Sequence, residues 1–201
     1  MFKRLLAHPG VEEFCELRSS FGFMAFHGGS LEEHTDVVAR LAAEKSGASY
    51  YGVHQPPDLK WHIDSHKIGP SDSPALASFL NHVEVVVTVH GYGRKGLFTT
   101  LLLGGRNREL ASHVAAHLRS WLPGYDIEHD LQQIPVELAG QHPLNPVNLP
   151  RGGGVQIELP PRVRGKSPYW SNWQGPALTP HTQALVEGLV AAASSWPAIA
   201  H

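Results

Sequence analysis

A histidine and a glutamate near the start of the chain have the types and spacing of two ligands in a catalytic metal site. His27 follows the apolar run Phe21–Phe26, which predicts a strand, and is itself followed by Gly28 and Gly29. Glu32 comes next, in the first turn of a predicted helix. Glycine adopts the backbone angles that fold a helix start back towards a strand end, so imidazole and carboxylate can meet across this turn. Taken alone, the pair is more simply explained as a core histidine and a solvated first-turn acid.

His90 completes a set of three candidate ligands. It ends the run Val83–His90, the most hydrophobic of the predicted strands, and is again followed by a glycine, Gly91. The carboxyl ends of parallel strands meet at one edge of an α/β sheet, where ligand sites collect. There, His27, Glu32 and His90 would form the two-histidine, one-glutamate shell of a catalytic zinc site, with the fourth position left for water. We therefore predict one zinc ion per chain.

Glu158 is the candidate general base. The run Val155–Leu159 alternates, so its three apolar residues are expected on one face of a strand, and Gln156 and Glu158 on the other. An acid inside an apolar strand is unusual unless it is paired or functional. A carboxylate beside the zinc site could take a proton from water and return it to a leaving nitrogen.

A carboxylate-bearing substrate would also need a cation, and arginine offers a bidentate fork for carboxylates. Five arginines follow strand ends or strand-like runs: Arg94, Arg106, Arg108, Arg162 and Arg164. Arg106 is the first choice because it follows the predicted strand Phe98–Leu103; the alternative is a solvated residue in the first turn of the next helix. His62 and His66 could reach the site as alternative metal ligands or as groups that contact the ligands, and His62 is also a candidate substrate-binding residue. The alternative for both is an exposed loop histidine.

Strands and helices alternate along the chain, which predicts an α/β fold with a mixed, largely parallel, twisted sheet flanked by helices. The predicted strands are Phe21–Phe26, Ser49–Val53, Lys60–Ser65, Val83–His90, Phe98–Leu103, Tyr125–Glu128 and Val155–Leu159. The predicted helices are Ser30–Ser46, Ser73–Asn81, Arg106–Leu122 and Thr179–Ser195. Ser30 and Glu33 match a capping box, which indicates that the first helix begins there.

The amino-acid composition limits the classes of protein to which this chain can belong. The chain has 201 residues, of which 42% are hydrophobic, and 16 Lys and Arg stand against 18 Asp and Glu. These values predict a single domain over residues 1–201 with a sizeable core. The formal charge of −2 predicts no nucleic-acid or membrane-surface partner. A lone cysteine, Cys15, excludes an intramolecular disulfide, and no apolar run approaches the ~20 residues of a membrane span.

The first residues resemble only the beginning of a signal peptide. Lys3 and Arg4 precede the short apolar run Leu5–Ala7, but His8–Gly10 ends it too early. We therefore expect a cytoplasmic protein without a signal peptide, which cell lysis could still release. The oligomeric state stays open.

In their order along the chain, these residues resemble the phage and bacterial poly-γ-glutamate hydrolase family, whose members are similar to compact zinc carboxypeptidases. The resemblance runs from about Phe21 to Arg164. It is carried by the motifs His27-Gly-Gly-Ser-Leu-Glu32-Glu-His-Thr35, Ser49-Tyr-Tyr, Trp61-His-Ile-Asp-Ser65, His90-Gly, Gly104-Gly105 and Gly154-Val-Gln-Ile-Glu158-Leu. Its most specific part is the ordered combination of the first motif, the Ser-Tyr-Tyr motif and the late Gln-x-Glu strand.

The resemblance implies a zinc-carboxypeptidase-like fold with three zinc ligands, His27, Glu32 and His90. It also implies Glu158 as the general base, in agreement with the strand-end prediction. Two departures lie beside the site. The family usually has glycine where this chain has His34, and Leu-His-Ile-Thr-Ser where this chain has Trp61–Ser65. They bear on the identity of the substrate more than on the metal.

The expected activity is zinc-assisted hydrolysis of an amide bond to glutamate, with the γ-glutamyl linkages of poly-γ-glutamate as the first-choice substrate. One alternative is an amidohydrolase of a small N-acyl amino acid such as formylglutamate. A polymer calls for an open groove, and a small acyl amino acid for a closed pocket. Another alternative is a non-catalytic, phage-associated metal-binding protein, against which Glu158 argues because a binding module has no use for a base. Zn²⁺ is the expected cofactor.

Overall fold

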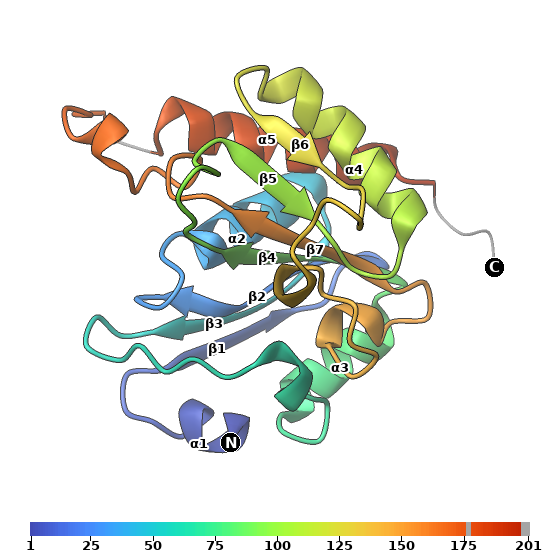
Figure 1. Ribbon diagram of the computed structural model, residues 1–201. Helices are drawn as coiled ribbons and strands as arrows, with labels where there is room; N and C mark the ends of the chain where they lie inside the picture. Colours follow the sequence, from blue (N-terminus) through green and yellow to red (C-terminus); the bar gives the residue numbers. More distant parts are fainter. Residues whose placement is uncertain (176–177, 198–201) are drawn as a thin grey trace.

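A seven-stranded mixed sheet forms the centre of the computed structural model, which describes residues 1–175 and 178–197; the other residues of the predicted domain 1–201 lie outside that description (Figure 1). The strand order is β1-β3-β2-β4-β7-β5-β6. The strands are β1 (Glu12–Glu16), β2 (Phe21–Gly29), β3 (Ser49–Gln55), β4 (Val85–Gly91), β5 (Thr100–Leu103), β6 (Asp126–Glu128) and β7 (Gly154–Leu159). β1 is antiparallel to β3 and β5 to β7, whereas all other neighbours are parallel. The predicted mixed, largely parallel sheet is confirmed.

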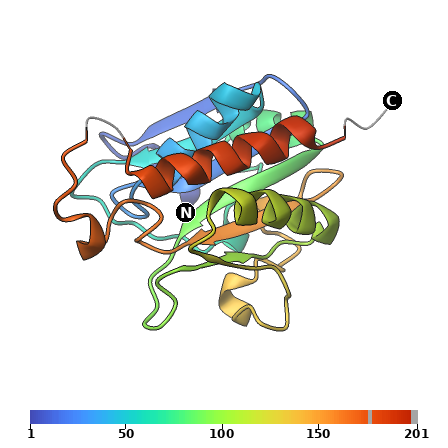
Figure 2. The same ribbon diagram turned by 90° about the horizontal axis from the view of Figure 1, so that it is seen from above.

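Helices cover both faces of this sheet, as predicted. The helices α2 (Thr35–Ser46), α4 (Arg108–Trp121) and α5 (Pro180–Ser195) lie over one face, onto which Figure 2 looks. The helices α1 (Phe2–Leu6) and α3 (Pro74–His82) pack against the other face (Figure 1). Short 3₁₀ turns occur at Ser65–Lys67, Val136–Leu138, Pro146–Asn148 and Pro168–Trp170. No helix in the described part of the chain is long and apolar enough to span a membrane.

The two layers of helices explain why the central strands are continuous apolar runs. In β2, Phe23 and Ala25 belong to the core under α2, α4 and α5, whereas Met24 and Phe26 belong to the core against α1 and α3. A strand covered on both faces must be apolar at every position. Each fully buried large side chain contributes about 1.5–3 kcal/mol of transfer free energy, so these runs hold the strand ends rigidly in place.

The first long helix begins later than the sequence predicts. α2 has His34 as its N-cap, and no side chain caps it, so the predicted capping box of Ser30 and Glu33 is wrong. The hydroxyl of Ser30 instead donates to a backbone carbonyl of a neighbouring loop. The N–H of Glu32 donates to the carbonyl of His27 at 3.0 Å. A turn that folds back onto the end of β2 therefore replaces the first helical turn, because its tertiary contacts outweigh one local cap.

Residues 60–65 form no strand, contrary to prediction. The outer position beside β3 is instead occupied by the edge strand β1 (Glu12–Glu16). The sequence did not indicate β1, because this segment lacks an alternation of apolar and polar residues. With that edge filled, the segment around Trp61 is held by the Gln55 side chain. Its Oε1 accepts from the Trp61 N–H, and its Nε2 donates to the Trp61 carbonyl.

Candidate metal centre and active site

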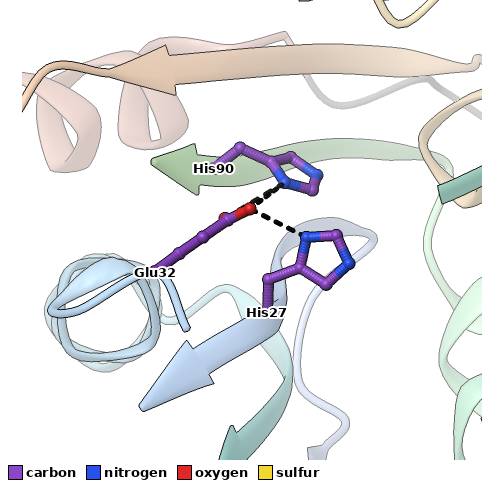
Figure 3. A group of neighbouring side chains, drawn as sticks. All are labelled: His27, Glu32 and His90. Atoms are coloured by element: carbon purple, nitrogen blue, oxygen red, sulfur yellow. Dashed lines mark hydrogen bonds and ion pairs between the residues drawn. The ribbon is translucent and has the colours of Figure 1, made fainter. Parts of the chain in front are cut away.

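His27 and His90 lie at the carboxyl ends of two adjacent parallel strands, β2 and β4 (Figure 3). The pairing of β2 with β3 shifts register between Ala25 and Gly28. Such a bulge inserts one extra residue and re-aims the side chains around it. The ring centroids of His27 and His90 are 5.0 Å apart. The structure thus brings together the two histidines that end separate apolar runs in the sequence.

Glu32 reaches both histidines from the turn that follows β2. Gly29 has a φ of 72°, and a Cβ there would lie 2.2 Å from a backbone carbonyl of β3, so this turn requires glycine. Glu32 Oε1 lies 2.9 Å from His27 Nδ1, and Glu32 Oε2 lies 3.2 Å from His90 Nδ1. The backbone N–H of Gly91 donates to Glu32 Oε2 at 2.9 Å. The ligand atoms of His27, Glu32 and His90, hereafter the trio, all lie within 4.8 Å of one another.

The trio is almost removed from solvent. The side chains of His27, His90 and Glu32 are 2%, 4% and 12% exposed. Burial disfavours the Glu32 carboxylate, but the two facing histidines outweigh it and hold the pKa of Glu32 well below its usual range. Burial likewise opposes a charge on His90, but Glu32 outweighs it and raises the pKa of His90. The trio is therefore a buried anionic group facing two imidazoles, an environment that favours a cation.

The hydrogen bonds of His27 indicate where that cation would lie. Its Nε2 is 2.9 Å from the carbonyl of Ile63, and because a carbonyl only accepts, Nε2 carries a hydrogen. In a neutral ring, Nδ1 then presents a lone pair to the Glu32 oxygen 2.9 Å away. Two lone pairs at this distance repel each other unless a proton or a metal ion lies between them. Two imidazole nitrogens and a carboxylate fit zinc, and a ring whose other nitrogen donates to a carbonyl is the usual form of a histidine ligand.

Glu158 lies next to His90, because β7 neighbours β4 and their register pairs the two residues. The residue is 4% exposed, while the three apolar residues of β7 point into the core on the opposite side, as the alternation predicted. Burial raises the pKa of Glu158 to about 7, although the facing His90 and a hydrogen bond from Gln156 lower it in part. A carboxyl group that titrates near neutral pH can both accept and release a proton.

Glu158 should make the metal-free protein less stable as pH rises. The folded state keeps a proton up to a pKa of about 7, whereas an unperturbed glutamate releases it at 4.5, so stability is lost between these values. Because glutamine does not titrate, Glu158→Gln should gain about 2–3 kcal/mol of unfolding free energy over the wild type between about pH 5 and pH 8. Urea unfolding with a chelator present measures this gain. The exposed control Glu109→Gln should show none, and equal pH dependence in Glu158→Gln and the wild type would contradict the assignment.

A pocket of about 800 Å³ is lined by the trio and Glu158. His62 and His66 also line it, and the ring centroid of His62 lies 5.0 Å from that of His27. Burial lowers the pKa of His62. The opposite wall comes from residues 136–145, including His142, whose ring centroid lies 4.7 Å from that of His66. Sequence reasoning missed this wall because a proline-rich loop has no periodicity; a histidine and an asparagine between its prolines were the only signal.

Arg106 does not reach this pocket, which corrects the predicted substrate contact. β5 runs antiparallel to β7, so the end of β5 that precedes Arg106 lies at the sheet edge opposite to the trio. Arg106 is exposed, and its backbone N–H donates to Asn148 Oδ1 at 3.0 Å. The prediction assumed that β5 runs parallel to its neighbours, and it therefore placed Arg106 at the same ends of the strands as the trio.

The other candidate arginines have structural partners. Arg94 forms an ion pair with Glu137, and Arg108 donates to backbone carbonyls around the end of β5. Arg162 lies over an aromatic ring at 4.0 Å. Arg164 is buried and donates to two backbone carbonyls. Neither lysine nor arginine occurs among the described residues that line the pocket, so its side-chain donors are histidines, amides and the hydroxyls of Ser65 and Tyr92.

His34 occupies a backbone position that favours glycine. His34 has a φ of 71° and is the only non-glycine residue with a positive φ in the described part of the chain. This left-handed conformation costs a side-chain-bearing residue roughly 1–2 kcal/mol. A hydrogen bond between His34 Nδ1 and the carbonyl of Arg164, at 2.7 Å, offsets part of that cost.

Comparison with known proteins finds solved structures with the same fold. A bacteriophage poly-gamma-glutamate hydrolase matches with a TM-score of 0.75 at 22% identity, over 90% of this chain and 87% of that one. The zinc-free apo form of YNDL matches with a TM-score of 0.72 at 20% identity, over 92% of this chain and 90% of that one. The gene product Atu2144 from Agrobacterium tumefaciens matches with a TM-score of 0.52 at 17% identity, over 91% of this chain and 95% of that one.

At these identities the structural matches show a shared fold. No curated protein sequence matches the chain. The family model of the poly-gamma-glutamate hydrolases, however, matches residues 6–169, most of the chain. The protein therefore belongs to the poly-gamma-glutamate hydrolase family.

Proposed function

We propose that this hydrolase is zinc-dependent and cleaves γ-glutamyl amide bonds of poly-γ-glutamate. The observation that carries the proposal is the buried trio, in which His27 Nδ1 faces Glu32 while its Nε2 donates to a carbonyl. Such an arrangement calls for a cation between the two side chains. A protein of the same fold, YNDL, is known in a zinc-free apo form, which makes zinc the first metal to test.

The roles follow from the positions of the side chains. His27, Glu32 and His90 would hold the metal, and zinc bound there would polarise the amide carbonyl and acidify the attacking water. Glu158 lies beside the trio, is buried, and titrates near neutral pH. In its ionised form it takes a proton from the attacking water and then donates it to the leaving amine. Hydrolysis is balanced, since one product gains the hydroxyl group and the other the proton.

The donors that line the pocket support an anionic substrate. Poly-γ-glutamate carries one free carboxylate on each residue. The described lining offers the imidazoles of His62, His66 and His142 as N–H donors for such groups. The two exposed acids of the lining, Asp64 and Glu137, each form an ion pair with a neighbouring cation, which weakens their repulsion of an anionic chain. His62, closest to the trio, is the proposed substrate-binding residue.

Zinc-loaded protein should release short oligomers or glutamate from poly-γ-glutamate and leave α-linked polyglutamate of matched length intact. The expectation follows from the family. The γ-linked chain carries its free carboxylate directly on the backbone carbon next to the amide nitrogen, whereas the α-linked chain carries it at the end of a side chain. Anion-exchange chromatography of the products measures it. Cleavage of formylglutamate without cleavage of the polymer would identify an amidohydrolase of small acyl amino acids instead. A zinc-loaded protein that binds the polymer and cleaves nothing would identify a non-catalytic binding protein.

A further inference from the structure

Three buried polar side chains on one side of the pocket are joined in series by hydrogen bonds. Asn145 Nδ2 donates to Gln156 Oε1 at 2.8 Å, and Gln156 Nε2 donates to Glu158 Oε1 at 2.8 Å. These three residues are 3%, 5% and 4% exposed. A buried polar group that loses its partner costs roughly 1–3 kcal/mol. The series is therefore stable only when all its members are hydrogen-bonded.

The backbone determines the direction of this series. Asn145 Oδ1 accepts from the backbone N–H of Val147 at 3.3 Å, and an N–H only donates, so the amide nitrogen of Asn145 must face Gln156. Gln156 then accepts with its oxygen and presents its nitrogen to Glu158. The same nitrogen also lies 3.4 Å from the carbonyl of Leu138. Both amide orientations thus follow from backbone groups, which resolves the usual ambiguity of amide side chains.

We propose that Gln156 is a positioning residue, which with Asn145 orients the Glu158 carboxylate for proton transfer. The inference rests on the proposed function of Glu158 as general base. The bond from Gln156 takes up Oε1 and limits rotation of the carboxylate, so Oε2 is the oxygen that takes the proton from water and returns it to the amine. A carboxylate held by one oxygen keeps the other in a constant place throughout the reaction.

The series is clamped by the loop that forms the far wall of the pocket. Asn145 is the N-cap of the 3₁₀ turn Pro146–Asn148. Gly140, in the same loop, has a φ of 63°, and a Cβ there would lie 2.8–2.9 Å from the side chain of Gln156. Glycine at this position therefore lets the loop close directly over Gln156. The segment that forms this wall of the pocket is thus also the one that holds the base in place.

The test separates kcat from KM in Gln156→Met, which keeps the length of the side chain but lacks the N–H donor. We expect wild-type zinc content, a KM within about threefold and a kcat lower by roughly 10–100-fold, as for a displaced catalytic group. Added to Glu158→Gln, the same change should lower the residual kcat by no more than about twofold, because Gln156 acts only through the base.

Asn145 and Asn148, in and just after the loop that walls the pocket, provide a matched pair of variants. This pair tests the proposal even if Gln156→Met does not fold. Asn148 Nδ2 donates to the carbonyls of Gly140 and His142, so it anchors the same loop without touching Gln156. Asn145→Ser should lower kcat several-fold with KM unchanged. Asn148→Ser should leave kcat within about twofold, since it disturbs only the loop.

Three results would overturn the proposal: wild-type kcat in folded Gln156→Met, an additive loss in the Glu158→Gln background, or equal losses in Asn145→Ser and Asn148→Ser. Failure of the proposed function looks different, because the wild type would then not cleave poly-γ-glutamate, or Glu158→Gln would itself keep wild-type turnover on it. If Glu158→Gln loses turnover while Gln156→Met retains it, only the positioning role is refuted.

Discussion

Glu158→Gln should lower turnover by at least about a hundredfold while zinc content and fold are retained. Glutamine keeps the shape of the side chain but cannot accept a proton from water. Glu158 is not one of the three residues whose ligand atoms converge, so its loss should leave the metal in place. Steady-state hydrolysis of poly-γ-glutamate, together with metal analysis of the same sample, measures both effects.

A second carboxylate of the same pocket provides the matched control. Glu137 lines the pocket but is 62% exposed and forms an ion pair with Arg94. Because an exposed ion pair contributes little to stability, Glu137→Gln should keep the fold, and its turnover should change by no more than a few-fold. Loss of zinc in Glu158→Gln would make Glu158 a ligand, and unchanged turnover would reduce it to a structural acid.

The two effects expected of Glu158→Gln have opposite signs, which excludes misfolding as their common cause. The substitution should raise the stability of the metal-free protein above neutral pH, since it removes a buried group whose pKa is raised to about 7. It should at the same time abolish most turnover. A site that costs stability and is needed for activity is the usual mark of a functional residue rather than a structural one.

His27→Ala and His90→Ala should each abolish stoichiometric zinc binding. Second-sphere partners of a metal typically contribute 10–100-fold to its affinity, so loss of a direct ligand should exceed about a hundredfold. Each variant also leaves the buried carboxylate of Glu32 with one facing imidazole instead of two. Metal analysis after dialysis against defined free zinc, and titration with a competing chelator, measure the affinity.

His62→Ala is the control for these two variants. Its ring lies against His27, with centroids 5.0 Å apart, but it is not part of the trio. This variant should keep its zinc, and any effect should fall on KM for poly-γ-glutamate. Wild-type zinc affinity in both His27→Ala and His90→Ala would refute the site, and a wild-type protein that takes up no zinc would refute the proposed cofactor.

The parallel strands at the centre of the sheet, and the side chains at their ends, could be predicted from the sequence. His90 ends a β-branched run that only a strand buried on both faces explains, and Glu158 lies on the polar side of a strictly alternating run. Both signals are local, because side-chain periodicity along a strand depends on that strand alone. Neighbouring parallel strands then bring their carboxyl ends to one edge, so His27 could be placed beside His90 without coordinates.

Only the tertiary structure decided which way the remaining elements run and which loops close over the site. β5 is antiparallel to β7, which moves Arg106 to the far edge of the sheet. The turn at residues 30–34 folds onto β2 instead of starting a helix at Ser30. The loop of residues 136–145 forms a wall of the pocket and, through Asn145 and Gln156, holds Glu158. Strand direction, turn placement and loop closure arise from contacts between residues distant in sequence, and no local pattern encodes such contacts.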